Sequence, residues 1–175
     1  QKELYNALYQ TVFAVSRDET RYILTGLSFT VNGETASFVG TDGKRLARVT
    51  IPLQVEKPLS YECIIPSKAV DEILRTVKQT DENATIFLLQ DKIAVETSQG
   101  LVMTKLLSGE FPEAERVIPT HSVAVIPLHR EELESLLRQT ALLISEENNS
   151  VRFTFQDNSL HLAANTANIG EGRVS

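Results

Sequence analysis

The chain has 175 residues, 42% of them hydrophobic, and a formal net charge of −6. This length allows one domain with a core, or one domain and part of another. No apolar run approaches the roughly 18 residues of a membrane-spanning helix, so we expect no membrane partner. The acidic balance excludes a chain that attracts nucleic acid over its whole surface, and DNA contact would require a local basic face.

Cys63 is the only cysteine, so the chain forms neither an internal disulfide nor a thiolate metal site. We expect Cys63 to lie in the core and the protein to be cytoplasmic. The three histidines stand far apart and have no neighbours at metal-ligand spacing. The sequence therefore predicts no metal, no cofactor and no catalytic constellation.

The first half of the chain predicts two helices and several antiparallel strands. Apolar residues at helical spacing predict a helix over 3–15. Asn32-Gly33 indicates a tight hairpin turn. Ser67, after Pro66, is expected to cap the second helix. The expected strands are 21–31, 35–40, 44–51 and 61–66, and the second helix is 67–79.

Three further strands are expected at 84–89, 92–97 and 101–107, followed by an irregular segment, 108–121. The pattern then begins again, with a strand at 123–127, a helix at 128–144 and a hairpin that turns at Asp157-Asn158. "FTVNGETASFVG" (29–40) matches "FTFQDNSLHLAA" (153–164) at a shift of 124 residues. This internal repeat predicts one complete domain, 1–121, and the truncated start of a similar domain, 122–175.

The stretch "GTDGKRLARV" (40–49) begins like a phosphate-binding loop, but its spacing does not fit. A phosphate loop needs a glycine five residues before the Gly-Lys pair and a Ser or Thr after it, whereas Phe38 and Arg45 occupy these places. Lys44 also leads into a strand pattern, whereas such a loop opens a helix. A hairpin turn with Leu24 and Leu46 in the core is the plainer alternative.

"TDGKRLA", "IIPSKAVDEILR" and "SGEFPEAERVIP" resemble, in order and spacing, the middle domain of the bacterial DNA polymerase sliding clamp family, the β subunit of the polymerase III holoenzyme. "LESLLRQTALLISEENNSVRFTF" resembles the opening of the family's third domain. The resemblance implies an α+β DNA-clamp fold, in which each domain holds two units of a helix with antiparallel strands. It also implies a ring of two head-to-tail chains around duplex DNA. Because Gln1 is not methionine, we expect a fragment of a longer chain.

The resemblance implies a pocket for short linear peptides of the replicative polymerase, the clamp loader and repair proteins. In this family the rest of the pocket comes from the end of the third domain, so the pocket of this chain is expected to be partial. The residues expected to line it are Leu24, Thr41, Gly43, Lys44, Arg45, Leu46, Pro112, Arg116 and Val117.

The family also implies weak, sequence-independent DNA contact through the helices that line the ring. Some members carry a second aromatic residue where this chain has Ile23, next to Tyr22, which weakens the case for stacking. Leu143 and Ile144 fall where the family's two chains meet, although packing at a helix end is an equal alternative. The residues expected to face DNA are Lys2, Arg17, Arg21, Tyr22, Lys68, Arg75 and Lys78.

The function expected from the resemblance is that of a processivity factor of bacterial DNA replication, not an enzyme. Its ring would hold DNA by topology and tether partners through the peptide pocket. One alternative is a clamp-like module that binds peptides without encircling DNA. Another is a nucleotide-using enzyme, which the mismatch with the phosphate loop disfavours.

Overall fold

The computed structural model describes residues 1–142, 144, 150–156, 159–166 and 170–174. Its contacts divide the chain into two units, Gln1–Pro119 and Thr120–Ser175. The division falls two residues before the expected end of the first domain at residue 121. Within the described residues, no helix has both the length and the apolar character needed to cross a membrane.

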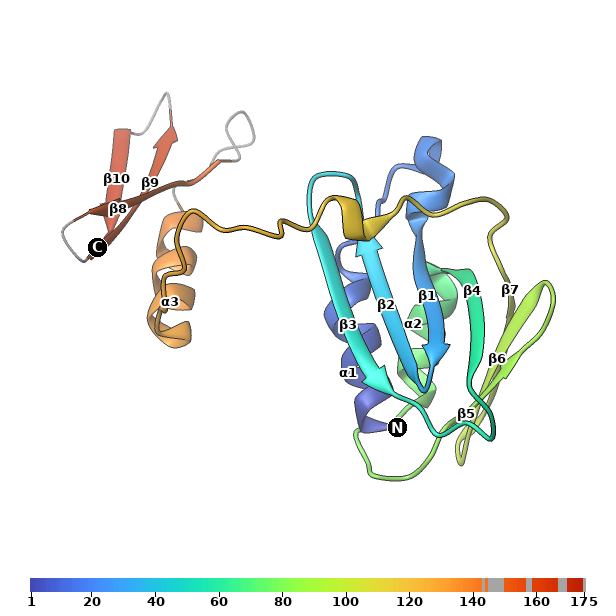
Figure 1. Ribbon diagram of the computed structural model, residues 1–175. Coiled ribbons are helices and arrows are strands. Elements are labelled where there is room, and N and C mark those ends of the chain that lie inside the picture. Colours follow the sequence, from blue (N-terminus) through green and yellow to red (C-terminus); the bar gives the residue numbers. More distant parts are fainter. Residues whose placement is uncertain (143, 145–149, 157–158, 167–169, 175) are drawn as a thin grey trace. The chain divides into compact units, whose positions relative to one another are not determined.

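The first unit contains two antiparallel sheets, two α-helices and two short 3-10 helices (Figure 1). Helices α1 (Lys2–Val12) and α2 (Ser67–Thr76) lie against one face of the larger sheet. That sheet has the order β3-β2-β1-β4 and the smaller has the order β5-β6-β7. Their strands are β1 (Gly26–Gly33), β2 (Thr35–Thr41), β3 (Leu46–Pro52), β4 (Leu59–Pro66), β5 (Thr85–Leu88), β6 (Lys92–Thr97) and β7 (Gly100–Lys105).

The main core lies between the larger sheet, the helices and the smaller sheet. Phe29 pairs with Phe38 on one side and with Cys63 on the other, so one row of side chains crosses three strands. The two phenylalanine rings are 4.9 Å apart between centroids. Cys63 is 8% exposed, as expected for a core cysteine. Other buried members of this core are Leu4, Leu8, Leu27, Val31, Ile65, Val70, Ile73, Ile93 and Val95.

Several expected boundaries differ from the structure. Helices α1 and α2 end at Val12 and Thr76, each three residues before its expected end, and α3 is shorter than expected. Three further differences have a local cause. Residues 21–25 form the end of a 3-10 helix, η1 (Glu19–Thr25), because Asp18 accepts a hydrogen bond from Thr20 N at 3.0 Å and turns the chain there. The third strand begins at Leu46, since the preceding residues form the turn described below. Ser67 is not the cap of α2: Pro66 holds the N-cap position, which places Ser67 inside the first turn.

The second unit contains α3 (Arg130–Ala141) and a sheet of order β10-β9-β8. Its strands are β8 (Arg152–Gln156), β9 (Ser159–Thr166) and β10 (Gly170–Val174). The expected strand at 123–127 is wrong: this segment has no strand partner among the described residues, and Val123 and Val125 are exposed. The turn expected at Asp157-Asn158 lies outside the described residues.

The internal repeat is visible in the strand register. Phe29 pairs with Phe38 in the first unit, and Phe153 pairs with Leu162 in the second, which is the same pairing shifted by 124 residues. Each preceding helix also carries a fully buried threonine. Thr11 Oγ1 donates to Ala7 O at 2.5 Å, and Thr140 Oγ1 makes the matching bond one turn back along α3 at 2.8 Å. The two units thus repeat both sequence and local structure.

Candidate peptide-binding surface and DNA-facing helices

One carboxylate organises the turn between β2 and β3. Asp42 Oδ1 accepts hydrogen bonds from the backbone N–H of Lys44 at 2.9 Å and of Arg45 at 3.0 Å. Thr41 Oγ1 accepts from Gly43 N at 3.0 Å and donates to Arg45 O at 2.6 Å. Gly43 has a φ of +83°, a left-handed conformation that favours glycine. The backbone N–H groups of residues 43–45 are therefore occupied within the turn.

A second apolar cluster lies on the face of the larger sheet opposite the helices. Val39 points away from the helices because its neighbour Phe38 points toward them, and Leu46 shares the side of Val39 through its pairing with Thr41. Leu24 and Leu46 are half-buried and thus present part of their surface to solvent. We call this group the sheet-end cluster: Val39, Ile64 and Phe111, with Ile23, Leu24, Leu46, Leu107 and Ala114 packed against them.

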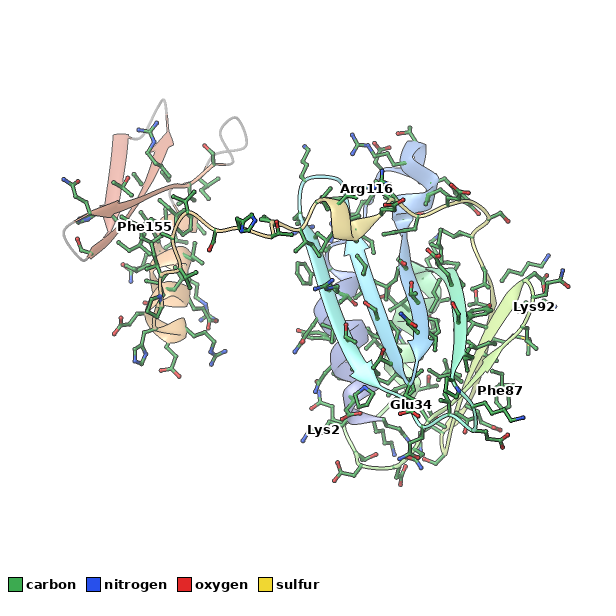
Figure 2. The ribbon with its side chains drawn as sticks, in the orientation of Figure 1. Lys2, Glu34, Phe87, Lys92, Arg116 and Phe155 are labelled. Atoms are coloured by element: carbon green, nitrogen blue, oxygen red, sulfur yellow. The ribbon has the colours of Figure 1, made fainter. Side chains whose placement is uncertain are left out.

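The segment after Phe111 continues this surface. Ala114 begins the short helix η2 (Ala114–Arg116) and packs against the sheet-end cluster. Arg116, labelled in Figure 2, lies on η2 and forms an exposed ion pair with Glu113. Pro112 is exposed, and Val117 is 68% exposed. The segment thus adds an uncovered apolar side chain, Val117, close in sequence to the cluster.

Arg45 lies apart from this apolar surface. Arg45 is in the turn directly before β3, and its side chain lies on the side opposite Leu46. Its Nη2 donates to Phe13 O at 3.0 Å, and its guanidinium carbon lies 5.5 Å from the centre of the Phe13 ring. Its Nε also donates to Asp42 Oδ2 at 3.1 Å. The structure therefore joins the guanidinium of Arg45 to the end of α1, whereas Leu46 joins the sheet-end cluster.

A hollow at the C-terminal end of α1 gathers four cations. Arg21 Nη1 donates to Asp42 O at 3.0 Å, which brings η1 against the β2–β3 turn. Asp18 and Asp42 line the same hollow, so its charge is mixed, with cations in excess. We call the four residues the helix-end basic cluster: Arg17, Arg21, Lys44 and Arg45.

A neighbouring groove brings together three of the residues expected to face DNA. It is lined by Arg17 after α1, by Tyr22 on η1 and by Lys68 on α2, together with Glu19 and Asp71. Tyr22 is 55% exposed. These side chains come from three separate segments, so their proximity is a product of the tertiary fold.

The other expected DNA-facing residues lie toward the opposite end of the helix pair. Lys2 N donates to Thr80 O at 3.0 Å, and Lys78 N donates to Gln1 Oε1 at 2.9 Å. The start of α1 therefore lies beside the end of α2, so the two helices run in opposite directions. Arg75 is exposed and pairs with Glu72 at 2.7 Å. The predicted cations thus form two groups, one at each end of the pair.

Hydrogen bonding and burial shift the pKa values of several groups. The backbone N–H groups of Lys44 and Arg45 lower the pKa of Asp42, and the hydrogen bonds from Thr20 lower that of Asp18. Burial raises the pKa of the Cys63 thiol to about 12. Asp42 is therefore held as an anion within the turn, whereas Cys63 is held as a neutral thiol and is a poor nucleophile.

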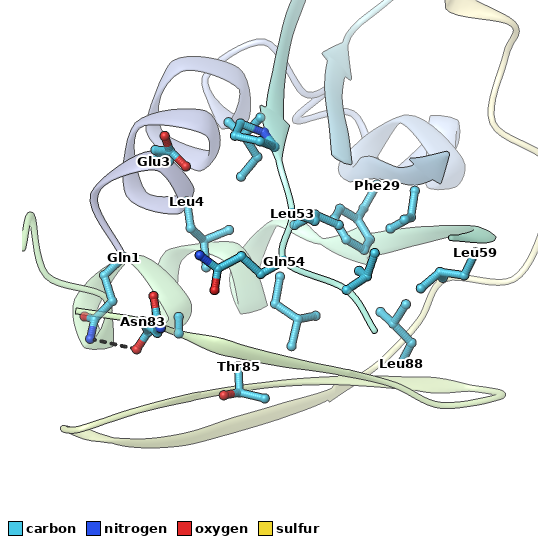
Figure 3. Close-up of a pocket in the computed structure, with 16 residues that line it drawn as sticks. Gln1, Glu3, Leu4, Phe29, Leu53, Gln54, Leu59, Asn83, Thr85 and Leu88 are labelled. Atoms are coloured by element: carbon cyan, nitrogen blue, oxygen red, sulfur yellow. Dashed lines mark hydrogen bonds between the residues drawn. The ribbon is translucent and has the colours of Figure 1, made fainter. Parts of the chain in front are cut away.

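A cavity of about 370 Å³ opens elsewhere in the first unit, between the start of α1, the chain after β3 and β5 (Figure 3). Leu4, Phe29 and Leu88 supply part of its apolar wall. Gln1 Nε2 donates to Asn83 O at 3.3 Å at its edge. All residues predicted to bind peptide or to face DNA are described, and none of them lines this cavity. The cavity is an open end of the main core.

The predicted dimer contact is only partly covered by the structure. Leu143 lies outside the described residues. Ile144 is half-buried, and its backbone N–H bonds to Ala141 O at 3.4 Å, just past the end of α3. This position fits the packing of a helix end, and the dimer contact stays a prediction.

Residues 1–113 match the family model of the DNA polymerase III beta subunit, central domain. The chain belongs to this family. It is 50% identical over 174 residues to the beta sliding clamp of Chlamydia pneumoniae, covering 99% of this chain and 47% of the relative. It is 31% identical over 165 residues to that of Pseudomonas aeruginosa, covering 94% of this chain and 45% of the relative. The chain thus spans about half the length of these sliding clamps.

Solved sliding clamps share the fold. The crystal structure of the clamp from Bacillus subtilis superposes with a TM-score of 0.91 at 29% identity, covering 98% of this chain and 46% of that one. The clamp from Pseudomonas aeruginosa bound to griselimycin gives a TM-score of 0.92 at 29% identity, covering 99% and 47%. The α+β clamp fold expected from the sequence is therefore confirmed.

Sequence reasoning named only Leu24 and Leu46 of the sheet-end cluster as pocket residues, and the residues that it missed include Phe111 in that cluster and Phe13 beside Arg45. Phe111 is 9% exposed and anchors the sheet-end cluster, and Phe13 holds the guanidinium of Arg45. An aromatic residue inside the otherwise polar segment 108–121 was an available signal for Phe111. Arg45 and Leu46 are neighbours in the strand expected at 44–51, and neighbouring strand residues point to opposite faces. The sequence therefore already indicated that these two side chains lie on opposite sides.

Proposed function

We propose that this chain is part of a sliding clamp that tethers partner proteins to DNA through a peptide-binding surface. The observation that carries the proposal is the sheet-end cluster, where Leu24 and Leu46 stay half-exposed around a buried Phe111. A partly formed apolar surface with polar groups nearby suits a short peptide that anchors through one large apolar side chain. Family membership favours a peptide-binding surface over the alternative, in which Leu24 and Leu46 are simply the solvent-exposed edge of the apolar core.

Within the proposal, the residues expected to line the pocket have different roles. Leu24, Leu46 and Val117 contact the apolar anchor of the peptide, whereas Thr41 and Gly43 shape the turn. Arg45 orders that turn by linking it to Phe13. Pro112, Lys44 and Arg116 lie at the margins, where they meet polar groups of the peptide; Arg116 does so by exchanging its exposed ion pair with Glu113.

We further propose that the helix face meets duplex DNA. The groups at the two ends of the α1–α2 pair offer cations to phosphates without reading bases. Because the sheet-end cluster lies on the opposite face of the same sheet, peptide and DNA would occupy opposite sides of the first unit. Weak contact of this kind permits sliding, since a closed ring does not depend on affinity to stay on DNA.

The complete protein is proposed to form a head-to-tail homodimeric ring with Leu143 and Ile144 near the contact, and to act as a non-catalytic processivity factor in the cytoplasm. Its proposed peptide partners are the replicative polymerase, the clamp loader and repair proteins. A ring and a clamp-like module that encircles nothing differ in topology. The full-length protein loaded on circular DNA should stay bound and should leave after linearisation, whereas a module that only touches DNA would treat the two forms alike.

Fluorescence anisotropy tests the peptide surface. The labelled probe carries a glutamine, then leucines, and ends in phenylalanine, and the control probe replaces that phenylalanine with alanine. We expect Leu46→Glu to abolish binding, because it places a carboxylate in the apolar contact. Thr50→Glu is the matched variant, since Thr50 is exposed on the same strand and the same face but away from the cluster.

If this chain does not bind the probe, the same titration with the full-length protein distinguishes an incomplete pocket from a wrong assignment. Binding by the full-length protein that survives Leu46→Glu would reject the sheet-end cluster as the peptide surface. No binding by the full-length protein would reject the peptide-pocket proposal itself.

A further inference from the structure

Three aromatic side chains form a row along one side of α1. Tyr5, Tyr9 and Phe13 follow one another at intervals of four residues, which places them one above the other, one turn apart. Phe13 directly follows the last residue of α1, and its helical φ of −63° and ψ of −21° continue the row. Tyr9 is 62% exposed and Phe13 is 59% exposed. We call these three residues the α1 aromatic row.

Contacts hold each ring of the row in place. Tyr5 packs against the main core. The ring of Tyr9 stacks on that of Tyr5, with 5.9 Å between the centroids and 10° between the planes. The ring of Phe13 lies 5.5 Å from the guanidinium carbon of Arg45. Neither Tyr9 nor Phe13 belongs to the main core or to the sheet-end cluster. The packing of the unit therefore does not account for these two exposed rings, and a ligand would meet them already ordered.

Cations flank the α1 aromatic row at both ends. Lys2 is exposed and stands three residues before Tyr5, on the same side of the helix (Figure 2). Beyond Phe13, the row leads to the groove that contains Arg17 and Lys68. The acidic residues of α1 and of this groove are Glu3, Glu19 and Asp71. An uncharged aromatic stretch thus lies between two places that offer cations to phosphates.

The groove beyond Phe13 adds a fourth aromatic residue. Phe13 and Tyr22 both line it, and Tyr22 is 55% exposed. Its volume of about 740 Å³ lies within the range of small-molecule sites. The groove is therefore wide enough for a nucleobase and presents two aromatic rings to it.

We propose that the α1 aromatic row binds single-stranded DNA by stacking on its unpaired bases. The inference rests on the proposed contact between the helix face and DNA, and it specifies a form of DNA that this face takes. Unpaired bases expose their faces to aromatic rings, whereas the bases of a duplex are stacked on one another. Phe13 has no polar side-chain group, so its exposed ring offers a nucleic acid only a stacking face. The rings take the bases, while Lys2, Arg17 and Lys68 take the phosphates.

The spacing of the row also favours a single strand. Four residues of helix rise by about 6 Å, whereas successive bases of a stacked strand lie about 3.4 Å apart. A strand whose successive bases meet Tyr9 and Phe13 is therefore extended and unstacked, which a paired strand within a duplex is not. Stacking accepts every base, so the contact is independent of sequence.

Tyrosine fluorescence measures this binding without a label on the protein. The 175-residue chain has four tyrosines and no tryptophan, and Tyr5, Tyr9 and Tyr22 lie in the row or the groove. An oligothymidylate of about 12 nucleotides matches the usual site sizes of single-strand binders. At low ionic strength it should quench the tyrosine emission. A duplex of the same length, compared at equal phosphate concentration, should quench less and bind more weakly, although its charge density is higher.

Variants at one position separate stacking from other contacts, with affinities read from the anisotropy of labelled oligonucleotides. Tyr9→Leu should weaken binding of the oligothymidylate by about tenfold, as expected for the loss of one stacked base, and should leave duplex binding unchanged. Tyr9→Phe keeps the ring and should bind like the parent chain, whereas a hydrogen bond from the tyrosine hydroxyl to a phosphate would be lost. Gln10→Ala is the matched control, because Gln10 is exposed on the same helix outside the row.

Lys68→Glu, in the groove, should weaken binding of both oligonucleotides. If neither oligonucleotide binds the parent chain, the proposed DNA contact of the helix face is wrong, and this inference with it. If the duplex binds and the single strand binds no more tightly, or if Tyr9→Leu weakens both equally, the stacking role alone is rejected. Dissociation of a dimer of the parent chain by Tyr9→Leu, seen in sedimentation, would show that the row is an interface between copies and would also overturn the inference.

Discussion

Replacing Gly40 with alanine tests the contact between α1 and the larger sheet. A Cβ atom at Gly40 would lie 2.3 Å from the carbonyl oxygen of Thr11 and 3.2 Å from its carbonyl carbon. The obstructing atoms belong to a helix backbone and not to a flexible side chain, and Thr11 is fully buried. Ordinary contact begins at about 3.4 Å, so α1 must move away from β2 by about 1 Å.

Over-packing of this kind costs about 1–3 kcal/mol, and the helix backbone places Gly40→Ala near the upper value. For a unit of this size that loss corresponds to a decrease in Tm of about 10 °C. Urea and thermal unfolding, followed by circular dichroism, measure both quantities. Because α1 leads to Phe13, which holds Arg45, binding of the glutamine–leucine–phenylalanine probe should weaken as well.

Gly33→Ala is the matched control for this prediction. Gly33 has a φ of +63° and no atom within 4 Å of an added Cβ, so the substitution costs only about 1–2 kcal/mol of backbone strain. Gly40 carries no such strain, since the described glycines with positive φ are 33, 43, 100 and 109. If Gly40→Ala proves no more destabilising than Gly33→Ala, α1 does not pack tightly on β2 and the reasoning is refuted.

Two other predictions follow from the pKa shifts. Cys63 should resist iodoacetamide at pH 8 in the native chain and react in urea, because burial keeps the thiol neutral; rapid labelling of the native chain, read by mass spectrometry, would contradict its place in the core. The pKa of Asp42 is lowered from 3.8, so its stabilising effect is present above that value and is lost as the pH falls through the folded-state pKa. Asp42→Asn should therefore reduce the acid dependence of unfolding as the pH falls below the ordinary aspartate pKa of 3.8, and an unchanged pH profile would show that the turn does not depend on this carboxylate.

The hairpins of this protein follow from local patterns in the sequence. Gly33 adopts the positive φ, +63°, that the turn between β1 and β2 requires. The alternation of large apolar residues on both strands sets the register. The same pattern recurs 124 residues later, which is why Phe153 and Leu162 meet as Phe29 and Phe38 do. Strand pairs this close in the chain need only a short turn, so neighbouring residues largely determine them.

Two segments with strand-forming composition do not form strands. In one a capping residue favours a 3-10 helix, and in the other a strand partner is lacking among the described residues. Residues 21–25 have the composition of a strand, but Asp18 caps a 3-10 helix there and Ile23 and Leu24 pack on the sheet-end cluster. The segment 123–127 is a continuous run of apolar residues that forms no strand, because a strand requires a neighbour to accept and donate its backbone hydrogen bonds. Propensity alone does not reveal that neighbour.

The candidate sites required contacts between distant parts of the chain. The family motif identified the turn at Asp42-Gly43, and strand alternation suffices to separate Arg45 from Leu46. Only the folded chain shows that Arg45 reaches Phe13, 32 residues away, and that Phe111 completes the apolar surface beside Leu46. Arg17, Tyr22 and Lys68 likewise share a groove because α1 and α2 run in opposite directions against the same sheet. Such contacts depend on how the elements pack against one another. The periodicity within a single element does not predict that packing.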